Sequence, residues 1–293
     1  MTTRTERGAG WGLAASTGQG FTHHSIVGAH FEACRGTYRQ ALELVGLRPG
    51  WQVLDAGCGP GDFLPWLCEL VGPDGAVSAL DLAPENAALA ARRAVDEPST
   101  AAVDVRVGDI RELPYADDAF DAVWCANTVQ YLDDESLMRA LAELRRVTRP
   151  GGLVAVKDLD ARLITVQPGD PDLLADFFRT AAAHSGYARQ LRRSGKLHSY
   201  LRAAGLESVR QRTLLAEHFA PLTEAAHGFY GRACAQLAAQ ITADAQDTAW
   251  QVLADPDHPD HPLRSPDGYV REGIVLAVGT VPAARRDEGP AVP

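Results

Sequence analysis

Through the middle of the chain, short apolar runs alternate with stretches whose apolar residues recur at helical spacing. Each run is bounded by glycine, proline or acidic residues, which is typical of buried strands. Strands are therefore predicted at 51–54, 76–80, 103–107, 120–125 and 153–157. Helices are predicted between them at 63–70, 84–95 and 135–147. This alternation favours an α/β fold, with a largely parallel sheet and helices on both of its faces.

The regions outside this alternation predict one elaborated domain rather than two large ones. The core is expected at 51–158, with a continuation at 188–218 and a last strand at 269–282. Helical patterns predict N-terminal cap helices at 18–50, an insertion at 159–187 that is mostly helical, and a helical lid at 219–268. Within these parts a helix is expected at 33–45 and a strand at 206–216. Residues 1–17 are expected to be mobile and residues 283–293 disordered.

A glycine-rich stretch, Asp55-Ala-Gly57-Cys58-Gly59-Pro-Gly61-Asp, joins the first predicted strand to the helix that follows. Glycines let a ligand approach the backbone, and free N–H groups at a helix start attract negative charge. The spacing does not match the G-x-G-x-x-G motif of dinucleotide folds, and no Lys-Ser or Lys-Thr follows as a P-loop requires. If only the glycines are considered, the alternative to a ligand-binding loop is a loop that simply turns the chain.

Acidic residues follow the second and third predicted strands. Asp81 lies 20 residues beyond Gly61, where the acid of a βαβ unit can accept hydrogen bonds from ribose hydroxyls. Gly108, Asp109 and Ile110 follow the third strand. There a carboxylate can accept from an adenine amine, and an apolar side chain can pack against the ring. A helix cap or surface acid at Asp81, and a simple Gly-Asp turn at 108–109, are the alternatives.

Taken together, residues 51–157 resemble class I S-adenosylmethionine-dependent methyltransferases, in particular the small-molecule branch with domains of type 11 or 25. The resemblance rests on the Asp-x-Gly-x-Gly-x-Gly loop, the acids after two strands, Phe120-Asp121, and the turn Arg149-Pro-Gly-Gly152. It implies a Rossmann-like, doubly wound, seven-stranded sheet with an antiparallel last strand. It also implies S-adenosylmethionine as cofactor, S-adenosylhomocysteine as product, and a cofactor site comprising Asp55, Gly57, Cys58, Gly59, Gly61, Asp81, Leu82, Gly108, Asp109, Ile110 and Asn127.

The activity implied by this resemblance is methyl transfer to a small-molecule acceptor such as a secondary metabolite. Whether oxygen, nitrogen or carbon accepts the methyl group stays open. One alternative is an enzyme of the same fold that binds the cofactor but catalyses a non-methylating reaction such as cyclisation. The other is a non-catalytic regulator that binds S-adenosylmethionine.

A catalytic base is helpful, though not obligatory, because methyl transfer depends chiefly on alignment of the reactants. Candidate bases are His23, His24, His30, His184, His198, His218 and His227. We name His24 from this set and Tyr131, which follows the fourth strand, as the catalytic candidates; a packing or surface role is the alternative for each. Asp158 and Asp160 could hold a cationic substrate, but no third ligand with suitable spacing is evident, so no metal site is predicted.

Composition narrows the range of partners. The net charge of −10 disfavours a nucleic-acid partner, and the five scattered cysteines indicate neither a disulfide framework nor a zinc site. No apolar run approaches the roughly 20 residues that a membrane span requires, and no signal-peptide pattern is evident. We therefore expect a cytoplasmic protein with a small-molecule substrate and no membrane partner. An oligomer is possible.

Overall fold

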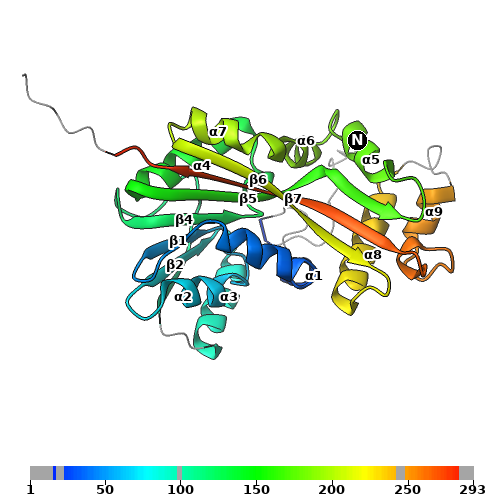
Figure 1. The fold of residues 1–293 in the computed structure, drawn as a ribbon, viewed down its shortest axis with the longest axis horizontal. Helices are drawn as coiled ribbons and strands as arrows, with labels where there is room; N and C mark the ends of the chain where they lie inside the picture. The colour runs from blue at the N-terminus through cyan, green and yellow to red at the C-terminus, as the bar shows by residue number, and fades with distance from the viewer. Residues whose placement is uncertain (1–15, 18–22, 98–100, 242–247, 284–293) are drawn as a thin grey trace, which may run out of the picture.

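The computed structural model describes residues 16–17, 23–97, 101–241 and 248–283 (Figure 1). The predictions of a mobile start at 1–17 and a disordered tail at 283–293 fall almost entirely outside these residues.

A seven-stranded sheet organises the chain, in the order β3-β2-β1-β4-β5-β7-β6. The strands are β1 (Gln52–Ala56), β2 (Ala76–Asp81), β3 (Ala102–Val107), β4 (Phe120–Ala126), β5 (Thr148–Gln167), β6 (Glu207–Phe219) and β7 (Tyr269–Thr280). Strands β1 to β5 pair in parallel, whereas β7 runs antiparallel to both β5 and β6. The predicted Rossmann-like sheet with an antiparallel last strand is confirmed.

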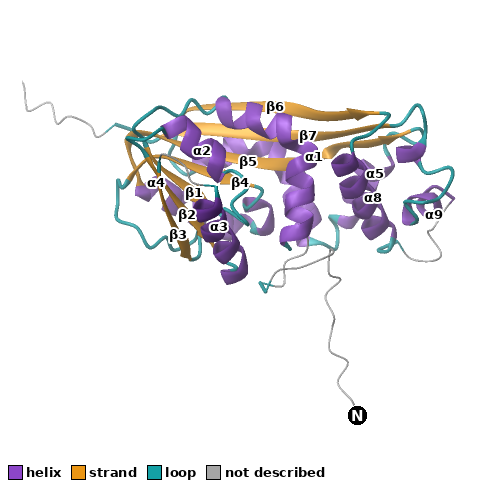
Figure 2. Ribbon diagram, turned by 90° about the horizontal axis from the view of Figure 1, so that it is seen from below, coloured by secondary structure: helices purple, strands orange, loops and turns teal. Residues whose placement is uncertain are grey.

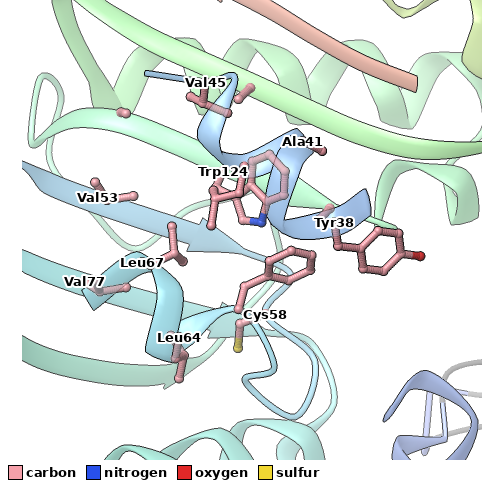
Figure 3. Close-up of a cluster of buried hydrophobic side chains, with 14 of the residues drawn as sticks. Tyr38, Ala41, Val45, Val53, Cys58, Leu64, Leu67, Val77 and Trp124 are labelled. Atoms are coloured by element: carbon pink, nitrogen blue, oxygen red, sulfur yellow. The ribbon is translucent and has the colours of Figure 1, made fainter. Parts of the chain in front are cut away.

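Helices cover both faces of this sheet. They are α1 (His24–Glu43), α2 (Leu64–Val71), α3 (Pro84–Asp96), α4 (Asp134–Val147), α5 (Leu173–Ala181), α6 (Gly186–Arg193), α7 (Leu197–Ala203), α8 (Glu224–Ala238) and α9 (Thr248–Ala254). Buried residues of α1, α2 and α3 form a core with one face, and those of α4 and α7 form a core with the other. Figure 3 shows part of the first core, where Tyr38 of α1 lies with its hydroxyl pointing out of the cluster.

The prediction that residues 159–187 are mostly helical needs correction, because β5 continues to Gln167 before α5 begins. Residues 165–167 of β5 pair with residues 269–271 of β7, and β7 pairs in turn with the end of β6. This pairing satisfies the backbone groups of the extension, and β-branched Ile164, Thr165 and Val166 suit a strand. Figure 2 shows the three long strands reaching over α5, α8 and α9.

The first helix also begins earlier than the predicted range 33–45. Helix α1 starts at His24, and the ring of His23 accepts a hydrogen bond from the Ser25 N–H at its start. Ile26, Phe31, Cys34 and Tyr38 lie on one buried stripe along the helix. The residues between 24 and 43 therefore form a single helix.

The predicted helical lid at 219–268 contains α8 and α9, which pack with α5 and α6 into a third hydrophobic core beneath the strand extension. Members of this core include Phe177, Phe229, Leu237 and Trp250. Among the described residues, none of the helices is both long enough and apolar enough to pass through a bilayer.

Candidate functional site

A cavity of about 490 Å³ lies where the carboxyl ends of the parallel strands meet the third core. Gly57, Asp81, Asp109 and Asn127, which follow or end strands β1 to β4, line one part of it. Residues of α1, β5, α5, α6, α8 and β7 line much of the rest. Its volume is within the range of roughly 300 to 1,000 Å³ that is usual for small-molecule sites.

All but three of the residues predicted for the cofactor site line this cavity. Those that line it are Gly57, Cys58, Gly59, Asp81, Leu82, Asp109, Ile110 and Asn127. The other three, Asp55, Gly61 and Gly108, lie outside the lining.

The glycine loop is fastened to the end of β2. The N–H groups of Gly57 and Cys58 both donate to the carbonyl oxygen of Leu80, at 2.7 and 2.9 Å. The N–H of Gly61 donates to the carbonyl of Cys58 at 3.0 Å. These three N–H groups are therefore engaged within the protein and hold the shape of the loop.

Packing explains the glycine at position 57. Its φ of +84° lies in the left-handed region, and a Cβ there would come within 2.9 Å of three atoms of the Thr128 side chain. The Thr128 hydroxyl donates to the Gly57 carbonyl at 3.2 Å, which holds the two segments together. Gly57 is thus required by its backbone conformation and by its contact with the loop after β4.

Asp81 shapes the loop and faces the cavity. Its Oδ2 accepts from the Gly59 N–H at 2.8 Å, and its Oδ1 accepts from the Ala83 N–H at 2.9 Å and the Asn86 amide at 3.4 Å. Burial raises the pKa of Asp81, and the backbone hydrogen bonds oppose that shift. A carboxylate offers about four acceptor positions, so these three donors leave capacity for a ligand hydroxyl.

The loop after β3 combines an ion pair with an apolar contact surface. The Arg111 guanidinium donates to both carboxylate oxygens of Asp109, and this bonding lowers the pKa of Asp109 below its usual value. Ile110 is buried and lines the cavity. The assignment of Asp109 to an adenine amine stays a prediction.

Asp62 lines the cavity and was missed as a candidate, since its position served only to exclude the dinucleotide motif. It pairs with Arg93 through Oδ1 at 2.5 Å, while its buried Oδ2 has no hydrogen-bond partner among the described residues. Burial raises the pKa of Asp62, which the Arg93 charge partly offsets. The sequence signal that could have identified Asp62 is the single acidic residue that directly follows the last glycine of the loop.

The catalytic candidates fall in different places. His24 is exposed at the start of α1 and outside the cavity lining, so its position argues against a role as base. Tyr131 lines the cavity and stacks on Tyr187, with ring centroids 5.4 Å apart. His30, further along α1, also lines the cavity.

Comparison with known proteins identifies the domain that carries this site. A family model described as a methyltransferase domain matches residues 53–152, which include β1 to β4 and the glycine loop. The chain carries a class I S-adenosylmethionine-dependent methyltransferase domain. The cofactor of this family is S-adenosylmethionine, and every residue of the cavity lining from Gly57 to Thr128 belongs to the methyltransferase domain.

Relatives of the methyltransferase domain include two streptomycete proteins. An uncharacterized 37.1 kDa protein in transposon TN4556 of Streptomyces fradiae is 35% identical over 148 residues, which are 50% of this chain and 41% of that protein. Methyltransferase GfsG of Streptomyces halstedii is 31% identical over 131 residues, 45% of this chain and 46% of its own length. The chain therefore spans about half the length of the curated relatives it matches, or less.

A solved structure supports the fold beyond the matched domain. A Bacillus halodurans protein, described as a candidate methyltransferase, aligns with a TM-score of 0.54 and 18% identity. The alignment covers 83% of this chain and 98% of that protein. At this identity the likeness extends to the architecture only.

Asp55 of the methyltransferase domain is a buried acid rather than part of the cavity wall. It is 1% exposed, and its Oδ2 has no hydrogen-bond partner among the residues that the structure describes. Burial, followed by the nearby carboxylates of Asp81 and Asp62, raises the pKa of Asp55 to about 8. The carboxyl group is therefore largely protonated at neutral pH in the folded protein.

We expect Asp55→Asn to reduce the loss of stability that accompanies rising pH. Because the folded-state pKa is about 8 and the ordinary value is 3.8, the folded protein binds the proton more tightly, and stability falls as pH rises between these values. From about pH 5 to about pH 8, wild type should lose roughly 2 to 4 kcal/mol more than the variant. Urea unfolding at the two pH values measures this, and parallel pH profiles would contradict it.

Proposed function

We propose that this protein transfers a methyl group from S-adenosylmethionine to a small-molecule acceptor. The observation that carries the proposal is one continuous cavity. It joins the strand ends of the methyltransferase domain to an apolar space beneath α5, α6 and α8. One part of this cavity suits a nucleoside and the other suits an apolar ligand.

The residues of the first part fit the cofactor. Asp81 has acceptor capacity for ribose hydroxyls, while Asp109 and Ile110 would flank the adenine. The unpartnered Oδ2 of Asp62 would accept from the ammonium of the methionine moiety. Asn127 would lie beside that moiety, held by the Lys157 ammonium at 2.5 Å. When bound, S-adenosylmethionine supplies an electrophilic methyl group whose C–S bond breaks with its electron pair going to sulfur.

The protein's own task is to orient the acceptor and exclude water. The roof of the cavity consists of buried apolar side chains from α5, α6 and α8, which disfavour bulk water near the reactants. Alignment of two reactants within such a space can contribute about 7 to 11 kcal/mol to lowering the barrier. Alignment of the reactants would therefore supply much of the catalysis.

The test combines binding and turnover. Calorimetry should show saturable binding of S-adenosylhomocysteine, and S-adenosylmethionine labelled in its methyl group should label some members of a panel of phenols, quinols, macrolide alcohols and amines. Binding without label transfer to any member would favour a non-methylating enzyme or a regulator. Absence of binding would overturn the proposal.

A further inference from the structure

A buried histidine–glutamate pair lies in the cavity wall, away from the glycine loop. His30 of α1 and Glu272 of β7 both line the cavity, and the His30 Nε2 lies 2.8 Å from the Glu272 Oε1. The Glu272 side chain is 2% exposed and that of His30 is 16% exposed. The His30 ring also stacks on Phe229 of α8, with centroids 4.2 Å apart, which fixes the plane of the imidazole.

The carboxylate of Glu272 is ionised. Burial alone raises its pKa, but the charge and hydrogen bond of His30, the Cys34 hydrogen bond and the Lys157 charge outweigh that effect and lower the pKa of Glu272 to about 2. An ionised carboxylate only accepts hydrogen bonds, so the His30 Nε2 must carry a proton. The lone pair of a neutral His30 is therefore on Nδ1.

Several polar groups surround this pair from the neighbouring elements. They are Cys34 and Tyr38 on α1, Lys157 on β5, His218 on β6 and Tyr230 on α8. The Tyr38 hydroxyl accepts a hydrogen bond from the Asn127 amide at 3.3 Å and lies 3.4 Å from Nδ1 and 3.3 Å from Nε2 of His30. The network thus connects His30 to the loop after β4, on the cofactor side of the cavity.

We propose that His30 is the general base for a hydroxyl acceptor and that Glu272 is its positioning residue. This inference rests on the proposed function and narrows it to an apolar alcohol or phenol. In the step, the acceptor O–H bond breaks, the proton goes to His30 Nδ1, and the electron pair stays on oxygen. This oxygen would then bond to the methyl carbon as the C–S bond breaks and leaves its electron pair on sulfur. Glu272 balances the positive charge that His30 gains.

The walls around His30 favour an uncharged, largely apolar acceptor. They are formed by buried side chains of Ile26, Leu174, Phe178, Leu191, Phe229 and Leu237. A charged acceptor would lose its hydration against these groups, and the ionised Glu272 in this wall is already bonded to His30 and Cys34. A hydroxyl compound with an apolar or aromatic body loses little hydration free energy in this cavity. Its hydroxyl would hydrogen-bond to the imidazole of His30.

A metal ion is the competing occupant, because one donor atom each of His30, Cys34 and Glu272 lie within 4.8 Å of one another. Burial, followed by the Glu272 charge, raises the pKa of the Cys34 thiol well above its usual range. The protonated thiol donates to Glu272 at 3.1 Å. Metal binding needs the thiolate, so these contacts favour a proton network over a metal centre.

The test uses 4-nitrophenol, a phenol that is coloured only when ionised, bound to the whole 293-residue chain together with S-adenosylhomocysteine. At about pH 6, wild type should bind it and ionise it, and His30→Gln should reduce the ionised fraction of bound probe by about tenfold. Glutamine retains a donor to Glu272, which keeps the wall intact. Glu272→Gln should retain binding but also lower the ionised fraction, while the exposed control His24→Gln should match wild type.

The remaining outcomes separate this inference from the proposed function. Absence of saturable 4-nitrophenol binding, or equal ionisation in wild type and His30→Gln, would overturn the inference even if the enzyme methylates other acceptors. Failure of all methyl transfer with the ionisation difference intact would overturn the proposed function and leave the base standing. Retention of one equivalent of zinc on dialysis, and its loss in Cys34→Ser, would show that His30 belongs to a metal site and would overturn its assignment as a general base.

Discussion

Replacing Asp81 with alanine is expected to weaken S-adenosylhomocysteine binding at least tenfold. The carboxylate holds the Gly59 and Ala83 N–H groups and, in the proposed complex, would accept from the ribose. Hydrogen bonds to a charged group are worth about 1.5 to 3 kcal/mol each, so the loss of one bond to the ligand suffices for this change. Calorimetry on the purified variant measures the affinity directly.

The control for this substitution is Asp104→Ala. Asp104 lies on the neighbouring strand β3, is exposed, and pairs with Arg106 at 2.7 Å outside the cavity. Its removal should leave the affinity within about twofold, because surface ion pairs contribute little. An Asp81→Ala protein that folds and binds as tightly as wild type would show that the ribose lies elsewhere.

The second large effect concerns folding. Gly57→Ala should lower the free energy of unfolding by about 2 to 5 kcal/mol, because a left-handed alanine costs roughly 1 to 2 kcal/mol and overpacking adds about 1 to 3 kcal/mol. The overpacking arises from the Thr128 side chain, whose nearest atom would lie 2.3 Å from the new Cβ. Urea unfolding monitored by circular dichroism provides the measurement.

A second glycine with the same backbone conformation separates the backbone cost from the overpacking cost. Gly46 has a φ of +85°, almost the same as the +84° of Gly57, but a Cβ there would meet nothing within 4 Å. Gly46→Ala should therefore show the backbone cost alone. Adding Thr128→Ala to Gly57→Ala should recover part of the difference, as the two atoms nearest the new Cβ are then absent. Equal destabilisation by the two alanines would refute the proposed clash.

Local pattern predicted the strands of the methyltransferase domain and the helices between them to within a few residues. A buried strand, a glycine loop and an amphipathic helix each depend on residues that are close together in the chain. Each can therefore be recognised from a short window of sequence. The same holds for Asp81 and Asp109, because parallel strands bring their carboxyl ends to one edge.

The tertiary structure decided what depends on distant partners. Residues 159–167 extend β5 because β7, a hundred residues later, supplies their pairing. Which histidine enters the cavity depends on the rotation of α1 about its axis, set by the buried stripe that includes Ile26 and Tyr38. The pair of His30 and Glu272 joins positions 242 residues apart. Residue types alone give each its chemistry, but only packing of the helix against the sheet brings the two side chains within hydrogen-bonding distance.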